Sequence, residues 1–114
     1  AKWALNAGVR FSSHMDTPVT PMRPLQAVWS PVERKTKTGV VLEPDQRIDR
    51  MSALRAVTID TAWQVFLDDQ IGSIESGKLA DLVVLSASPL TAPDMRQLKV
   101  DTTLIEGVTH FQRN

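Results

Sequence analysis

The sequence has 114 residues, 42% of them hydrophobic, so it can form one domain with a buried core but not a complete (β/α)₈ barrel, which needs roughly 200 residues. Its 13 basic and 13 acidic residues balance to a formal net charge of zero, which argues against binding to nucleic acid or an anionic membrane surface. It has no cysteine, which excludes disulfides and thiolate ligands and suits a cytoplasmic location.

Neither a membrane span nor a secretion signal is predicted. No apolar run approaches the ~20 residues of a membrane-spanning helix, and the N-terminus lacks the charged-then-apolar layout of a signal peptide. The chain opens without Met on AKWALNAG, which is typical of the end of a helix. This opening predicts a piece of a longer polypeptide or a processed chain.

The first half of the chain predicts short helices separated by loops. A helix over residues 2–7 is expected to end at Gly8, a residue suited to the position after a helix. The β-prone run Val9–Ser13 predicts a short strand, and a proline-rich loop follows it. Pro24 suits the first turn of the next helix, and Pro31 is expected to kink or end that helix because its ring displaces a carbonyl.

The best-marked helix begins after Asp49, a plausible N-cap. Four apolar residues follow it at helical spacing: Met51, Ala53, Leu54 and Val57. Thr58 indicates a break, and a second short helix is predicted over residues 60–66. Three of its side chains are expected to face inward: Ala62, Trp63 and Phe66.

The pattern then changes to β-structure. The run DLVVL at residues 81–85 predicts a buried strand that ends before Pro89. A connection with about one helical turn follows. Residues 100–111 predict a hairpin that turns at Glu106-Gly107, because glycine adopts the positive φ that a tight turn needs.

Gly72, Gly77 and Lys78 have the G-x-x-x-x-G-K spacing of a phosphate-binding loop. Such a loop needs Ser or Thr after the lysine and a following helix. Here Leu79 follows, and then a strand. The alternative is a hairpin turned by Glu75–Gly77, with Lys78 as a surface charge. We favour this second interpretation.

Four stretches, in this order, resemble members of the amidohydrolase superfamily, and the first resembles its YtcJ-like, amidohydrolase-3 branch. They are SSHMDTPVTPMRPL, RMSALRAVTIDTAWQVF, GSIESGKLADLVVLSASPL and VDTTLIEGVTHF. The resemblance covers nearly the whole chain. It implies an α/β fold in which residues 1–66 are the last strand and helices of a TIM-like barrel. It also implies that residues 67–114 are the C-terminal part of a small β-sandwich.

Asp16 matches the aspartate that ends the eighth barrel strand in that family. The resemblance implies that Asp16 coordinates a divalent metal, Zn²⁺ by preference, and accepts a proton from the attacking water. A carboxylate at the C-terminal end of a barrel strand lies where active sites of that fold are found. The alternative is a loop aspartate that caps nearby backbone N–H groups before Pro18.

His14 lies two residues before Asp16, so both would point to one face if the strand continued through them. The resemblance implies that His14 faces the substrate, and the alternative is an exposed loop histidine. His110 is expected in the final hairpin, away from the site. Arg34 is interpreted as a surface or helix-end charge, and Asp81 as a structural residue bonded to turn backbone.

Two functions remain open at this point. The resemblance implies the C-terminal portion of a metal-dependent amidohydrolase that hydrolyses amide or N-formyl C–N bonds of a small molecule. Such a chain would be inactive alone, because a catalytic metal needs about three protein ligands, and would need its missing N-terminal barrel portion. The alternative is a non-catalytic module that associates with itself through an exposed strand. Neither function involves nucleic acid or a membrane.

Overall fold

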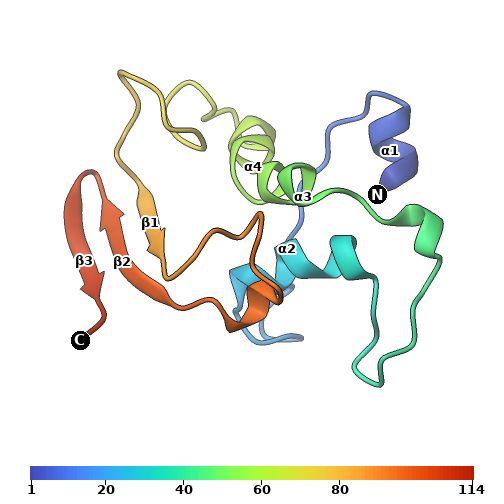
Figure 1. Ribbon diagram of the computed structural model, residues 1–114. Coiled ribbons are helices and arrows are strands. Elements are labelled where there is room, and N and C mark those ends of the chain that lie inside the picture. Colours follow the sequence, from blue (N-terminus) through green and yellow to red (C-terminus); the bar gives the residue numbers. More distant parts are fainter.

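The computed structural model describes all of residues 1–114 and places the helices on one side of the molecule and a small sheet on the other (Figure 1). The α-helices are α1 (Lys2–Asn6), α2 (Pro24–Glu33), α3 (Arg50–Ala56) and α4 (Ile59–Gln64). Two 3₁₀ helices are η1 (Pro44–Gln46) and η2 (Met95–Gln97). The strands are β1 (Leu82–Leu85), β2 (Val100–Ile105) and β3 (Val108–Gln112).

The predicted helix starts are confirmed. The Asp49 side chain accepts a hydrogen bond of 2.9 Å from the backbone N–H of Ser52, so it caps α3 as expected. Thr58 stands between α3 and α4 and marks the predicted break. Pro24 is the first residue of α2, where its missing N–H removes no helical bond. Local signals therefore place the helices correctly.

Pro31 does not end α2, which continues to Glu33. The helix ends at Arg34, which adopts a left-handed conformation (φ 48°) and donates its side-chain Nε to the carbonyl oxygen of Leu42, 2.7 Å away. Arg34 is thus a helix-end residue, as predicted. Because proline has no N–H, Pro31 leaves the carbonyl of Ala27, one turn earlier, without its usual helical donor.

The buried core lies among α2, α3 and η2. Its centre consists of Val28, Ile48, Ala53 and Met95. Met95 is 1% exposed and comes from the connection before the hairpin, so it links the second half of the chain to the helices. Beside it, the guanidinium of Arg96 lies 4.0 Å from the centre of the Trp29 ring, a cation–π contact that joins η2 to α2.

The predicted inward face of α4 is partly wrong. Ala62 is buried, but Trp63 is 44% exposed and Phe66 is 88% exposed. The helix ends at Gln64, and Phe66 follows it with a positive φ of 61°. Its side chain therefore no longer shares the helical periodicity on which the prediction rested.

The predicted strand Val9–Ser13 is also wrong, since these residues form no strand. A strand requires a neighbouring strand for its backbone hydrogen bonds, and this chain contains none beside this segment. The backbone N–H of Ser13 instead donates to the carbonyl of Ala56 at the end of α3, 2.9 Å away.

The three strands form an antiparallel sheet in the order β1-β2-β3. The predicted hairpin is confirmed: Glu106 and Gly107 have φ angles of 51° and 79° and connect β2 to β3. Asp81 accepts a 2.8 Å hydrogen bond from the backbone N–H of Glu106, in keeping with its predicted structural role. The predicted burial of β1 is wrong, because Val83 is 55% exposed and Val84 is 49% exposed.

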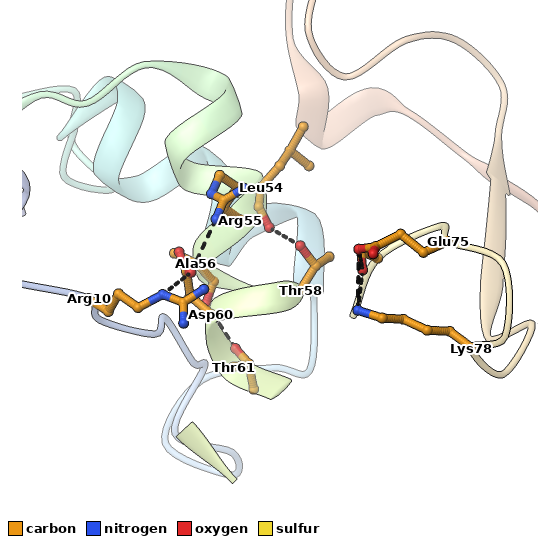
Figure 2. A network of polar contacts seen from close by, with 10 residues as sticks. Arg10, Leu54, Arg55, Ala56, Thr58, Asp60, Thr61, Glu75 and Lys78 are labelled. Atoms are coloured by element: carbon orange, nitrogen blue, oxygen red, sulfur yellow. Dashed lines mark hydrogen bonds and ion pairs between the residues drawn. The ribbon is translucent and has the colours of Figure 1, made fainter. Parts of the chain in front are cut away.

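The segment with the phosphate-loop spacing forms neither a phosphate loop nor the predicted hairpin. No strand precedes Gly77, and β1 rather than a helix follows. Lys78 is not a surface charge: its side chain is 11% exposed, and its ammonium donates to the Asp68 carbonyl and the Ser73 hydroxyl, both at 2.6 Å. Glu75 lies 3.3 Å from the same ammonium (Figure 2). The Lys78 side chain thus closes the loop between α4 and β1 by bonding residues on its other side, Asp68 and Ser73.

Gly72 has a different reason for being glycine. A Cβ added there would lie 2.7 Å from the Cβ of Ala62 and 2.9 Å from the Cα of Ile59. Its φ is also positive, at 91°. The glycine therefore allows the loop to approach α4 closely.

Candidate functional site

The segment that leads to Asp16 is held against α4 by side-chain contacts. Arg10 donates from Nε to a carboxylate oxygen of Asp60, 3.2 Å away, and its guanidinium lies 4.9 Å from the centre of the Trp63 ring. Arg55 approaches the same carboxylate at 3.7 Å (Figure 2). The hydroxyl of Ser12 donates to the Gln64 side chain. These contacts fix the path of the segment over the helix.

Ser13 connects the segment to two other helices. Its backbone N–H donates to the Ala56 carbonyl, and its hydroxyl donates to the Ala27 carbonyl at 3.3 Å. The Ala27 oxygen is the one that Pro31 leaves without a helical donor. Thr61 donates its hydroxyl to the same Ala56 oxygen, 2.9 Å away. Ser13 therefore donates hydrogen bonds to one carbonyl of α2 and one carbonyl of α3.

Neither Ser13 nor Thr61 is among the site residues predicted from the sequence. A proline inside α2 indicates that one carbonyl of that helix lacks its donor. The sequence does not indicate which distant hydroxyl supplies the replacement.

Asp16 begins a tight turn directly after this anchored segment. Its φ is 54°, a left-handed conformation that aspartate tolerates better than most residues. Its carbonyl accepts the backbone N–H of Val19 at 2.8 Å, and the turn contains the cis peptide bond between Thr17 and Pro18. The Asp16 residue is exposed, and its carboxylate takes part in none of the seven salt bridges of the chain.

His14 contacts Asp16 through the backbone. The N–H of Asp16 donates to Nδ1 of His14, 3.1 Å away. The two residues do not belong to a strand, so the prediction that their side chains point to one face of a strand does not apply. They nevertheless line the same pocket.

This pocket has a volume of about 500 Å³. The ten residues that line it are Ser13, His14, Met15, Asp16, Thr17, Met22, Pro24, Ala27, Val57 and Thr61. Asp16 is the one carboxylate in this set, and the methionines, Pro24 and Val57 give the walls an apolar character. A cation beside Asp16 with a neutral organic group next to it suits this lining.

A larger groove of about 1250 Å³ runs between α2, η2 and the sheet. Its charged residues are Arg23, Lys35, Lys37, Asp94 and Arg96. Its one carboxylate, Asp94, is paired with Arg96 at 2.7 Å, and that pairing lowers the pKa of Asp94. The groove therefore offers no unpaired carboxylate for chemistry.

Asp16 fits one ligand position of a divalent metal, because it presents an exposed carboxylate with no cation of the chain beside it. No group of three or more His, Asp or Glu side chains in the structure is arranged to hold a metal ion. His110 lies on β3 and is not part of the pocket. The pocket thus contains one carboxylate, that of Asp16, and not a set of residues that could hold a metal ion.

Comparison with known proteins identifies the family of the chain. The model of the family described as "Amidohydrolase family" matches residues 1–111. The chain belongs to the amidohydrolase family. The resemblance noted in the sequence is thereby confirmed.

Two curated proteins and one solved structure show how the chain relates to this family. It is 38% identical over 111 residues to the N-substituted formamide deformylase of Arthrobacter pascens, covering 96% of this chain and 20% of that protein. It is 24% identical over 118 residues to the putative amidohydrolase YtcJ of Bacillus subtilis, covering 99% of this chain and 22% of that protein. The chain therefore spans about a fifth of the length of these relatives.

The structural comparison supports an α/β fold like that of an amidohydrolase. The structure of an amidohydrolase from Thermotoga maritima MSB8 superposes with a TM-score of 0.74 at 29% identity, covering 96% of this chain and 24% of that one. In addition, none of the helices has the length and apolar character needed to cross a membrane.

Proposed function

We propose that this chain is the C-terminal portion of a metal-dependent amidohydrolase that hydrolyses amide or N-formyl C–N bonds. The observation that carries the proposal is the exposed Asp16 carboxylate, which lies in a pocket at the end of an anchored segment and has no cationic partner. The family membership and the similarity to a formamide deformylase support the reaction class.

In this proposal, residues 1–66 are the last strand and helices of a TIM-like barrel, and residues 67–114 are the C-terminal part of a β-sandwich. The similarity to an amidohydrolase structure and the three-stranded antiparallel sheet support this division. In the whole protein, neighbouring strands would flank Val9–Ser13, and further β-structure would cover the exposed face of β1.

Asp16 has two tasks in the proposed reaction. Its carboxylate would be one of the groups that hold a divalent metal, and it would accept the proton of the attacking water. A bound divalent metal, Zn²⁺ by family resemblance, supplies the Lewis acidity that brings the pKa of water toward neutrality. The water oxygen adds to the carbonyl carbon, the C–N bond breaks, and Asp16 returns the proton to the departing nitrogen. The products are a carboxylic acid and an amine.

His14 is the proposed substrate-binding residue, because it lines the same pocket as Asp16. The partner of this chain is the N-terminal barrel portion, which would contribute the remaining metal ligands, or a second copy of the chain. We propose a cytoplasmic location for the protein. The chain alone supplies too few ligands for a catalytic metal, so residues 1–114 by themselves are expected to be inactive.

The test compares the complete protein with its Asp16→Asn variant, using release of formate from an N-substituted formamide as the measurement. Asp16→Asn is expected to lower kcat by about 10²- to 10⁴-fold, the range attributed to a general base. The matched control is Asp69→Asn at an exposed loop aspartate, which should retain full activity. Equal activity of the two variants would refute the role of Asp16.

A non-catalytic module that associates with itself is the second candidate. The observation that favours it is the sheet order, which leaves the outer edges of β1 and β3 unpaired. Unpaired edges are templates for pairing with another chain. Light scattering on residues 1–114 at increasing concentration tests this candidate: a dimer supports it, and a strict monomer argues against it.

A further inference from the structure

The hydrogen bond between Asp16 and His14 assigns the tautomer of the histidine. The backbone N–H of Asp16 donates to Nδ1 of His14 across 3.1 Å. An imidazole nitrogen that accepts a hydrogen bond carries no proton, so the proton of the neutral ring lies on Nε2. Nε2 has no hydrogen-bond partner within the chain. His14, which lines the pocket, therefore has one N–H donor that no group of the chain accepts.

This arrangement is the reverse of the one that a metal-ligating histidine has. Such a histidine usually donates its second ring N–H to a carboxylate, carbonyl or water. In His14, by contrast, Nδ1 accepts the backbone N–H of Asp16, and the proton of the neutral ring is on Nε2. Ligation through Nε2 would require that proton to be lost, and ligation through Nδ1 would break the bond to Asp16.

Two hydroxyl groups that line the pocket already donate to backbone carbonyls. The Ser13 hydroxyl donates to the Ala27 carbonyl, and the Thr61 hydroxyl donates to the Ala56 carbonyl. Apart from Thr17, which follows Asp16 in the turn, His14 is thus the lining residue whose side-chain donor remains free. An amide or formyl carbonyl oxygen becomes more negative during hydrolysis and needs such a donor.

We infer that His14 is a hydrogen-bond donor, through Nε2–H, to the carbonyl oxygen of the substrate, and that it is neither a metal ligand nor the general base. This inference rests on the proposed function and adds the substrate atom that His14 binds. Asp16 and His14 then have different roles. The Asp16 carboxylate accepts the proton of the attacking water, and the His14 imidazole donates a hydrogen bond to the substrate carbonyl oxygen, which gains negative charge during the reaction.

Two amide substitutions of His14 separate its two nitrogens. His14→Gln places an amide near the position of Nε2 and keeps a donor there. His14→Asn places its amide near Nδ1, so it can still accept the Asp16 N–H but lacks the distal donor. In the complete protein, His14→Asn is expected to lower kcat by about 10²- to 10³-fold with a smaller change in KM, as for loss of an oxyanion donor.

His14→Gln should recover kcat to within about tenfold of the unmodified protein, and both variants should retain the metal content of the unmodified protein. His110→Asn on β3 is the matched control and should have full activity. Loss of metal in His14→Asn would show a ligand role and overturn the inference. An unchanged kcat in His14→Asn would also overturn the inference. So would a loss of kcat in His14→Gln equal to that in His14→Asn.

A second measurement does not depend on turnover. The ¹⁵N spectrum of the histidine side chains in the complete protein reports which ring nitrogen carries the proton. We expect the resonance assigned to His14 by its absence in His14→Asn to show a protonated Nε2. A protonated Nδ1 would overturn the inference even if the protein hydrolyses formamides. A protonated Nε2 without any hydrolysis would instead point to failure of the proposed function.

Discussion

Ser13 donates its hydroxyl to the carbonyl oxygen of Ala27, 3.3 Å away, which lacks a helical donor because Pro31 has no N–H. A feature that weakens α2 thus provides an attachment point for the segment that leads to Asp16. The backbone N–H of Ser13 bonds Ala56 at the same time. One residue therefore fixes this segment to both α2 and α3.

Replacing Ser13 with alanine should destabilise the protein by about 1–3 kcal/mol, because the Ala27 carbonyl, in a residue that is 5% exposed, would lose its donor. The measurement is the midpoint of urea unfolding. Ser30→Ala, on an exposed position of the same helix, is the control and should change stability by less than about 0.5 kcal/mol. Equal midpoints for the two variants would contradict this role.

Gly72→Ala should destabilise the protein by about 2–4 kcal/mol, since the new methyl would overlap Ala62 and Ile59 and the positive φ disfavours any Cβ. Gly39→Ala is the matched control. Gly39 has a similar φ of 89°, but nothing lies within 4 Å of a Cβ added there. The control should therefore show the conformational part of the cost, about 1–2 kcal/mol. If both variants unfold at one midpoint, the close approach to α4 has no energetic importance.

Lys78→Met should destabilise the loop between α4 and β1 by about 1–3 kcal/mol, because the part-buried Asp68 carbonyl would lose a charged donor. Hydrogen exchange at the backbone N–H of Leu79, which bonds the Gln70 carbonyl at 2.9 Å, reports on this loop directly. That exchange should become faster in Lys78→Met and remain unchanged in Lys37→Met, an exposed lysine. Unchanged exchange in both would show that Lys78 does not close the loop.

Stability should depend on pH through Asp49. Hydrogen bonds from the Ser52 hydroxyl and backbone N–H lower the pKa of Asp49 in the folded protein. The stabilisation is therefore fully present above the unfolded pKa of about 3.9 and is lost as the pH falls through the lower folded value. Asp49→Asn keeps a capping oxygen but does not titrate. The stability advantage of the unmodified protein over this variant should shrink between pH 5 and pH 2, and a constant difference would contradict the assignment.

Features set by neighbouring residues were predictable from the sequence. Asp49 caps α3 through Ser52, three residues on, and Glu106-Gly107 turns the hairpin, so both depend on local chemistry. The prediction of a strand at Val9–Ser13 was wrong, because a strand depends on neighbouring strands that the sequence of the segment itself does not specify.

Long-range contacts account for the other failures. The sequence predicts Lys78 as a surface charge. In the fold its ammonium donates to the carbonyl of Asp68, ten residues earlier in the chain. The pairing of Ser13 with Ala27 joins a loop to a helix, and no periodicity encodes it. For Asp16, the sequence supplied the residue through family resemblance, and the structure adds its free carboxylate and its pocket. The role of Asp16 itself stays a prediction.

The most direct test of the metal role of Asp16 is anomalous diffraction from crystals of the complete protein, recorded at the absorption edge of the metal that co-purifies with it. We expect an anomalous peak about 2.0–2.2 Å from a carboxylate oxygen of Asp16, the distance of a zinc–carboxylate bond, with Nε2 of His14 outside bonding distance. A fully occupied metal site that Asp16 does not touch would contradict it.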